Sequence, residues 1–344
     1  MSPVPFAHAA QSGWQLLQRL ATVQPRHPKF TIGLDVGSSA VKVVALGSRK
    51  ASSTPPLLGH HQVVLTGSSD AEISSAIKEA VSTLALPVKT VTFSVSGQAV
   101  ILRVVEMPTM KPEELAQALP IEAQRHLPFQ IKDVALDGAI LGPADDHKIW
   151  VLLVACKREF LEHRIQVVQQ AGFSPGCIDV DTLALANAFL QQGNGQPSTG
   201  AHAVVNVGAE QTNLAVLRGA TPDLIRDIPW GATKFIHQAA EQLGRDPAEV
   251  AAQLRQAAPL SPEFQAAIKA ACDSITADLQ LSFDFFENRF GISPDRLLMS
   301  GGLSECAGFL EGLRAHLTLP ISPWSPVSEL SGAYTIAYGL ALRT

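Results

Sequence analysis

The chain has 344 residues, of which 46% are hydrophobic, 17% are charged and 6% are aromatic. This balance excludes a disordered chain, a coiled coil and a collagen-like fibre, and the length suits about two domains. The formal net charge is −5, from 26 Lys and Arg against 31 Asp and Glu, which argues against a dedicated nucleic-acid-binding protein. No stretch reaches the roughly 18 uninterrupted apolar residues of a membrane-spanning helix.

The cysteines and histidines predict no metal centre. The cysteines lie far apart, without a Cys-x-x-Cys pair, and no His-Glu-x-x-His motif occurs, although zinc sites need such closely spaced ligands. A Gly-x-Ser-x-Gly elbow is also missing, so nothing supports a serine hydrolase. We expect four reduced thiols, at Cys156, Cys177, Cys272 and Cys306.

Residues 1–28 differ in pattern from the rest of the chain. Phe6, Trp14 and Leu20 fall on one side of a predicted amphipathic helix over about 6–22, and polar residues fall on the other. Pro25 and Pro28 end this helix. Two interpretations stay open: a helix or loosely ordered tail belonging to its own domain, and a weak interfacial or partner-binding helix.

From residue 30 onward the pattern predicts alternating strands and helices. Two β-branched-rich strands around a Gly-Ser-Ser turn predict a hairpin. A helix that begins at Pro112 is expected to be interrupted or kinked at Pro120. The hairpin strands are 30–36 and 40–46, the further strands are 62–66, 90–96, 99–105 and 149–155, and the other helices are 71–84, 157–171 and 181–191.

After a polar, Gly-rich connector at 193–200, the second half begins like the first. The stretch 201–217 again predicts a strand, a glycine turn and a strand. A strand at 296–300 runs into a Gly-Gly turn. The expected helices are 231–243, 246–257, 262–290, 307–317 and 333–342.

The two halves form an internal repeat. An offset of 171 residues places Asp35 on Asn206 and aligns most apolar positions. Two similar α/β halves that face each other would form a cleft between two glycine turns. The identical pairs are Val36 with Val207, Gly37 with Gly208, and Leu46 with Leu217.

The first glycine turn carries groups that suit a phosphate. Gly37, Ser38 and Ser39 offer backbone N–H groups and hydroxyls, and Lys42 can neutralise a phosphate oxygen. Asp35 ends the preceding strand and can hold Mg²⁺ through water, because hard cations prefer carboxylate oxygen. The alternative is an ordinary hairpin with a solvent-facing aspartate.

The second turn and the later Gly-Gly turn add candidate binding residues. Gly208 and Ala209 allow close backbone approach, and Thr212 offers a hydroxyl. Gly301 and Gly302, followed by Leu303, can lie against a nucleoside or present N–H groups at a helix start. Taken alone, each segment could be a plain hairpin or a simple strand-to-helix turn.

Together these segments resemble the PilM family of type IV pilus assembly proteins. That family is related to the division protein FtsA within the superfamily of actin, hexokinase and the heat-shock chaperone ATPases. The resemblance covers about 30–342, and its segments follow in family order: 33–42 (GLDVGSSAVK), 96–103 (SGQAVILR), 107–115 (MPTMKPEEL), 122–129 (EAQRHLPF), 154–157 (VACK), 171–175 (AGFSP), 179–187 (DVDTLALAN), 226–229 (RDIP) and 300–302 (SGG).

The resemblance implies an α/β, actin-like (ribonuclease H-like) duplicated fold that binds ATP and Mg²⁺. Its first half would span 29–195, with a small inserted subdomain of the FtsA and PilM type at about 95–170. Its second half would span 196–344, with an adenosine loop and a closing helix, and 1–28 would be an extension.

Three positions depart from the family pattern. Asn206 replaces the aspartate usual in the second phosphate loop, Ala232 follows Gly231 where two glycines are common, and Pro120 lies in a helix that is normally continuous. Asparagine cannot accept a proton, so we expect ATP to be bound and turned over slowly at most. Glu210 or Asp181 could organise the attacking water instead.

The resemblance also implies a cytoplasmic adaptor at the inner membrane. Its partner would be the cytoplasmic N-terminal peptide of a PilN-type membrane protein, with PilO and the pilus motor ATPases further along, and self-association is left open. We expect a short Leu-rich peptide to dock between the first-half core and the small subdomain, in the region from Phe93 to Phe129.

Three alternatives remain. A small-molecule kinase of the same superfamily needs a carboxylate base in its cleft, and neither half supplies one clearly. An FtsA-like division protein usually carries a C-terminal amphipathic anchor, whereas Thr344 directly follows the predicted closing helix. A related secretion-system protein would share most of these features.

Overall fold

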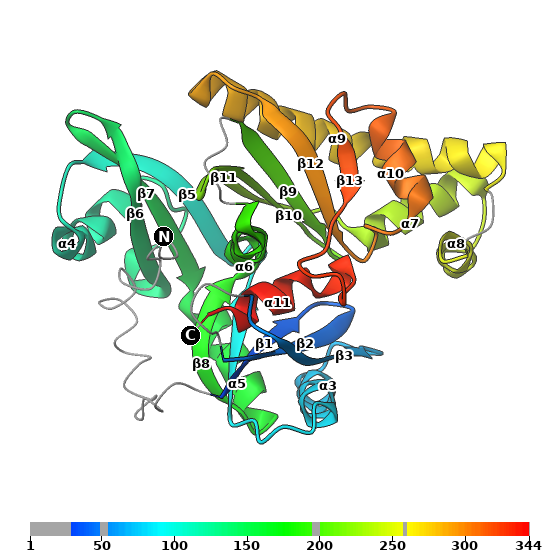
Figure 1. Cartoon of the computed structure of the whole chain (residues 1–344), viewed down its shortest axis with the longest axis horizontal. Helices are drawn as coiled ribbons and strands as arrows, with labels where there is room; N and C mark the ends of the chain where they lie inside the picture. The colour runs from blue at the N-terminus through cyan, green and yellow to red at the C-terminus, as the bar shows by residue number, and fades with distance from the viewer. Residues whose placement is uncertain (1–28, 49–53, 195–199, 257–259, 344) are drawn as a thin grey trace.

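The computed structural model describes residues 29–48, 54–194, 200–256 and 260–343. It contains two five-stranded sheets and one three-stranded sheet, with helices around them (Figure 1). The predicted helix over 6–22 lies outside the described residues.

The two large sheets have the same strand order and the same strand directions. In the first sheet the order is β3-β2-β1-β4-β8, and in the second it is β11-β10-β9-β12-β13. Three antiparallel strands in each are followed by two parallel ones. This symmetry confirms the duplication. The strands are β1 (Phe30–Val36), β2 (Ala40–Gly47), β3 (Leu57–Val64), β4 (Thr90–Val95), β8 (Ser174–Val180), β9 (Ala201–Val207), β10 (Thr212–Arg218), β11 (Thr221–Ile228), β12 (Pro294–Gly301) and β13 (Ile321–Pro323).

The small sheet is inserted in the first half, between β4 and the helix α5 (Arg158–Gln170). Its order is β5-β7-β6, and one helix, α4, packs its apolar residues Leu115, Leu119 and Ala123 against it. These elements fall inside the range 95–170, although the boundaries of the subdomain stay a prediction. They are β5 (Val100–Pro108), α4 (Pro112–Ala123), β6 (Val134–Asp145) and β7 (Lys148–Lys157).

Helix α4 continues through Pro120, where the sequence predicted an interruption or a kink. A proline inside a helix removes one backbone hydrogen bond and costs about 3 kcal/mol. Leu115, Leu119 and Ala123 recur every four residues on the buried face, at most 4% exposed, and their burial offsets this cost.

Four strands were not predicted from the sequence, namely β6, β8, β11 and β13. Strand β8 has the sequence SPGCIDV, and a proline followed by a glycine is typical of a turn. In the sheet, however, a Cβ on Gly176 would lie 2.7 Å from Thr90 Cγ2, so the glycine allows close pairing with β4. Long-range pairing decides the structure here.

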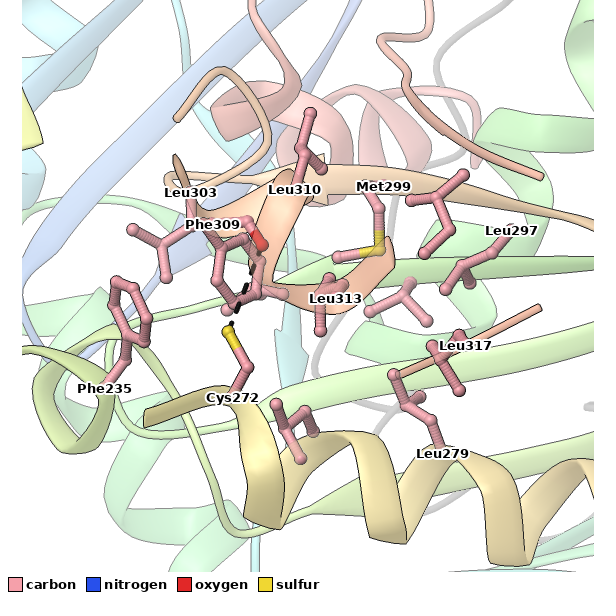
Figure 2. Close-up of a cluster of buried hydrophobic side chains, with 14 of the residues drawn as sticks. Phe235, Cys272, Leu279, Leu297, Met299, Leu303, Phe309, Leu310, Leu313 and Leu317 are labelled. Carbon is pink, nitrogen blue, oxygen red and sulfur yellow. Dashed lines mark hydrogen bonds between the residues drawn. The ribbon is translucent and has the colours of Figure 1, made fainter. Parts of the chain in front are cut away.

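The helices cover the outer faces of the sheets and lie between them. In the second half, Phe235, Cys272 and Phe309 belong to a core shared by three helices and the sheet (Figure 2). The helices are α3 (Asp70–Thr83), α5 (Arg158–Gln170), α6 (Asp181–Phe189), α7 (Ala232–Leu243), α8 (Pro247–Leu254), α9 (Pro262–Phe290), α10 (Ala307–Arg314) and α11 (Thr335–Ala341).

Helices α6 and α11 lie between the two large sheets (Figure 1). Their backbones approach very closely, since a Cβ on Gly339 would lie 1.9 Å from Ala184 O. On the other side, a Cβ on Gly33 of β1 would lie 1.9 Å from Ala337 O. This close packing of α6, α11 and β1 joins the two halves of the chain.

Candidate functional site

The two glycine turns have the same geometry. Gly37 N–H donates to Ala40 O at 3.1 Å, and Gly208 N–H donates to Gln211 O at 2.8 Å, positions that the repeat relates. A Cβ on Gly208 would lie 2.9 Å from Gln211 O and one on Gly37 3.1 Å from Ala40 O, so a side chain would clash in the second turn and crowd the first. The sequence therefore predicted both turns correctly.

The first turn presents hydroxyls and an ion pair. Ser38 and Ser39 are exposed, whereas Asp35 is 8% exposed. Asp35 and Lys42 are cross-strand neighbours, and Lys42 Nζ lies 3.0 Å from Asp35 Oδ2. The turn thus combines exposed hydroxyls with a carboxylate whose charge one lysine already balances in part.

The second turn rests on the start of helix α7. Ala232 N–H and Thr233 N–H donate to Gly208 O and Ala209 O, both at 2.9 Å. A Cβ on Gly231 would lie 2.4 Å from Ala209 O, which explains the glycine there. Because α7 takes up two carbonyls of this turn, the turn is held rigidly against the second-half core.

Thr212 and Leu303 are placed differently from the other candidate residues. The Thr212 side chain is fully buried, and its hydroxyl donates to Trp230 O at 2.7 Å. Leu303 is 8% exposed and belongs to the second-half core shown in Figure 2. Both side chains are buried, so only the backbone of these residues could contact a ligand.

The Gly-Gly turn packs on the end of β9. Gly301 has φ +92°, and a Cβ there would lie 2.2 Å from Val207 O. Gly302 N–H donates to the same oxygen at 3.1 Å, while its α-carbon has open space around it and is exposed. The turn therefore offers a flat, open backbone surface beside the second glycine turn.

Asn206 belongs to a buried chain of hydrogen bonds. Asn206 Oδ1 accepts from the Ser300 hydroxyl at 3.3 Å, and Asn206 Nδ2 donates to Asn213 Oδ1 at 3.2 Å. Asn213 Nδ2 then donates to Asp227 Oδ1 at 2.9 Å, which also accepts from the Thr182 hydroxyl at 2.5 Å. The chain links the second turn to the start of α6.

Asp227 was not identified as a site residue from the sequence. It lies in the segment RDIP, the signal that could have drawn attention to it. Its second carboxylate oxygen, Oδ2, is buried and has no hydrogen-bond partner among the described residues. A buried oxygen in this state is costly unless a ligand or water satisfies it.

Asp181, at the start of α6, is a third acidic group near Asp35 and Asp227. Its Oδ1 accepts a hydrogen bond from the Ser94 hydroxyl at 2.5 Å. Desolvation, reinforced by the negative charges of Asp35 and Asp227, raises the pKa of Asp181 to about 7. Glu210, by contrast, is exposed on the second turn. Three carboxylates from both halves of the chain thus lie close enough to affect one another electrostatically.

These groups fit a nucleotide that carries Mg²⁺ better than a bare polyphosphate. Asp35, Asp181 and Asp227 would repel phosphate oxygens, and a divalent cation between them would reverse that repulsion. No group of three or more His, Cys, Asp or Glu side chains among the described residues could hold a metal directly. Most ligands of a cation here would therefore be phosphate oxygens and water.

The region expected to dock a peptide is partly core. Phe93 is fully buried, and Phe129 packs against the small-sheet core with Lys157 Nζ 4.6 Å from its ring centre. Ile121 on α4, however, is 68% exposed. Most of the predicted apolar residues thus stabilise the fold, and Ile121 is an apolar side chain left at the surface.

A family model described as "Type IV pilus assembly protein PilM" matches residues 33–344. The chain belongs to the PilM family. It is also similar to the solved structure titled "PilM-PilN type IV pilus biogenesis complex", with a TM-score of 0.80 and 25% identity over 92% of this chain and 99% of that one. The PilM-type interpretation of the sequence is confirmed, and the kinase and FtsA-like alternatives are not favoured.

More distant structures agree with PilM on the fold. The ethanolamine utilization protein EutJ from Carboxydothermus hydrogenoformans matches with a TM-score of 0.54, 13% identity and 98% coverage of both chains. A Bacteroides thetaiotaomicron protein with an actin-like ATPase fold matches with a TM-score of 0.50 and 9% identity, over 91% of this chain and 96% of that one. The predicted actin-like fold is confirmed. Within the described residues, no helix has the length and apolar character needed to cross a bilayer.

Proposed function

We propose that this chain is an ATP-binding adaptor of the type IV pilus inner-membrane complex, which docks the cytoplasmic N-terminal peptide of a PilN-type membrane protein. The observation that carries this proposal is the match to the PilM family over 33–344 together with the similarity to the PilM–PilN complex. The protein would be cytoplasmic and reach the membrane through this partner. PilO and the motor ATPases would follow further along the assembly.

The nucleotide would lie between the two glycine turns. Gly37, Ser38 and Ser39 would bind phosphate oxygens, and Asp35 would hold a water of the Mg²⁺ ion while Lys42 neutralises a phosphate. Gly208 and Ala209 would approach the phosphates from the other half. Gly302 would lie against the nucleoside. Mg²⁺ would supply charge neutralisation, which three nearby carboxylates make necessary.

Calorimetry of Mg²⁺–ATP binding tests this site. We expect Asp35→Ala to weaken ATP binding at least tenfold, because the metal loses its organising carboxylate. Asp273→Ala is the matched control, since Asp273 pairs with His316 in the second half and its side chain is 64% exposed. No binding by the folded wild type would overturn the proposal, and equal affinity in Asp35→Ala would remove Asp35 from the site.

The partner site is tested with a synthetic PilN-type peptide. Hydrogen exchange should show protection between Phe93 and Phe129, and protection only elsewhere would reject this docking region. Two single variants sharpen the test: Ile121→Lys and Leu281→Lys each replace an exposed apolar side chain, 68% and 58% exposed, but only the first lies in the proposed region. We expect only Ile121→Lys to weaken peptide binding.

A further inference from the structure

The Gln211 side chain lies at the contact between the two halves of the chain. Gly97, in the turn between β4 and β5, has φ +86°, and a Cβ on it would lie 3.2 Å from Gln211 Oε1. The turn is held by a hydrogen bond from Val100 N–H to Gly97 O at 2.9 Å. The amide of Gln211 therefore packs directly against first-half backbone.

The other end of the same amide has an unmet hydrogen-bonding requirement. Gln211 Nε2 is buried and has no hydrogen-bond partner among the residues that the structure describes. An amide N–H is a strong donor, and burying one unpaired is unfavourable, so such a group calls for an explanation. A ligand that enters the cleft would supply the missing acceptor.

Gln211 is also the remaining side-chain donor of the second turn. Ala209 has no polar side chain, and the Thr212 hydroxyl is bound to Trp230 O. Glu210 is exposed and would repel a phosphate. The backbone carbonyl of Gln211 accepts from Gly208 N–H, which fixes the point from which its side chain starts.

The surroundings of the amide indicate which acceptor it would meet. Ser94, three residues before Gly97, donates its hydroxyl to Asp181 Oδ1 at 2.5 Å, so the first-half side of this contact is linked to an acidic group. The amide nitrogen is a neutral donor, and it would form its strongest hydrogen bond to an ionised oxygen. The last phosphate of a nucleotide held between the two turns would place ionised oxygens beside the contact between the two halves.

We infer that the Gln211 side-chain amide recognises the terminal phosphate of the nucleotide and so distinguishes a nucleoside triphosphate from a diphosphate. This inference rests on the proposed binding of ATP. Gln211 is a specificity residue in this role: it donates one hydrogen bond to the third phosphate and contacts neither the base nor the sugar. Because the same side chain touches Gly97, it also links the presence of that phosphate to the contact between the halves.

The test compares affinities for Mg²⁺–ATP and Mg²⁺–ADP by calorimetry. Gln211→Met keeps the length of the side chain and removes the donor, and Gln211→Glu puts a negative charge in its place. We expect Gln211→Met to weaken ATP binding about tenfold and to leave ADP binding within about twofold. Gln211→Glu should weaken ATP binding further because the carboxylate repels the phosphate.

Gln280→Met is the matched control, since Gln280 lies exposed on α9 and donates to Asp284. It should leave both affinities unchanged, and thermal melting should show that all variants fold. Equal weakening of ATP and ADP, or no change, in folded Gln211→Met overturns the inference while the proposed function stands. If the folded wild type binds neither nucleotide, the proposed function fails and the inference fails with it.

Discussion

The hydrogen-bond chain from Ser300 to Asp227 runs in one direction, and this direction explains the asparagine at position 206. Asn206 accepts from Ser300 and donates to Asn213, which in turn donates to Asp227. An aspartate at 206 would meet the oxygen of Asn213. If the Asn213 amide turned over to donate to that aspartate, its oxygen would face the carboxylate of Asp227 instead. The asparagine at 206 is therefore matched by the neighbouring residues.

Asn206→Asp should destabilise the nucleotide-free protein by about 1–3 kcal/mol, because two buried acceptors would face each other and a fourth carboxylate would join the cleft. Urea unfolding at pH 7 measures the loss. Asn206→Ser is the comparison, since a hydroxyl can still donate. An Asn206→Asp variant as stable as the wild type would contradict this account of the chain.

The same variant tests why turnover should be slow. An aspartate adds the charge and the proton acceptor that asparagine lacks, so we expect the single-turnover rate of ATP hydrolysis to rise in Asn206→Asp. ATP affinity is measured alongside. Rapid hydrolysis by the wild type, or no gain in a variant that still binds ATP, would show that another group, such as Asp181 or Glu210, controls the rate.

Asp181 should make stability depend on pH. Its pKa is about 7 in the folded protein against the ordinary 3.8 of an aspartate, so the folded state binds more protons than the unfolded state between about pH 4 and 7. The free energy of unfolding should therefore fall as the pH rises through this range. Asp181→Asn should remove this dependence of the free energy of unfolding on pH. Relative to wild type, the variant should gain stability from pH 4.5 to 7.5, and parallel urea-unfolding curves would contradict this.

At the scale of elements, the crossing of α6 and α11 depends on glycine. In a helix, alanine is normally favoured over glycine by about 1 kcal/mol. At Gly339, however, a Cβ would lie 1.9 Å from Ala184 O, so the helices would have to move apart. These two helices carry the packing between the large sheets, so a shift there would change the width of the cleft.

Gly339→Ala should therefore destabilise the protein by about 3 kcal/mol or more, as overpacking does. Gly302→Ala is the control for stability, because a Cβ on Gly302 would meet nothing within 4 Å. Thermal and urea unfolding compare the two variants. An unchanged stability of Gly339→Ala would mean that the helices can separate at little cost.

At the scale of the whole molecule, an ion pair connects the segment after α11 to the first half. Arg343, just after α11, lies with its Nε 2.9 Å from Asp179 Oδ2 on β8. The Asp179 side chain is only 3% exposed, so it depends on this cation. The negative charge of Asp179 raises the pKa of Arg343, which keeps the guanidinium charged.

Arg343→Met should lower the free energy of unfolding by about 3 kcal/mol, because it leaves a buried carboxylate unpaired. Arg125→Met removes an ion pair with Glu122 at the surface, where the Arg125 side chain is 74% exposed. This variant should lower the free energy of unfolding by less than about 1 kcal/mol. Urea unfolding at neutral pH measures both. Equal losses would show that the Asp179 pair is no more important than a surface pair.

The sequence alone determined the features that depend on short stretches of chain. Tight glycine turns at Gly37 and Gly208, flanked by strands, and the long helix ending in Gly291 follow from local turn and cap chemistry. The order of motifs from 33 to 302 was enough to predict the family and the fold. Strands such as β8, rich in proline and glycine, were missed because pairing partners far along the chain hold them.

Which groups of the candidate site act together depends on contacts between residues that lie far apart in the sequence. Thr182 and Asp227 are 45 residues apart, and they meet because α6 packs between the sheets. In the sequence, Gln211 is only a polar residue in a turn. The structure places its side chain beside Gly97 of the other half. The raised pKa of Asp181 comes from desolvation and from two carboxylates, Asp35 and Asp227, that lie far from it in the sequence. Charge, desolvation and unpaired donors depend on what surrounds a group in space, and this is the part of the site that no short stretch of sequence contains.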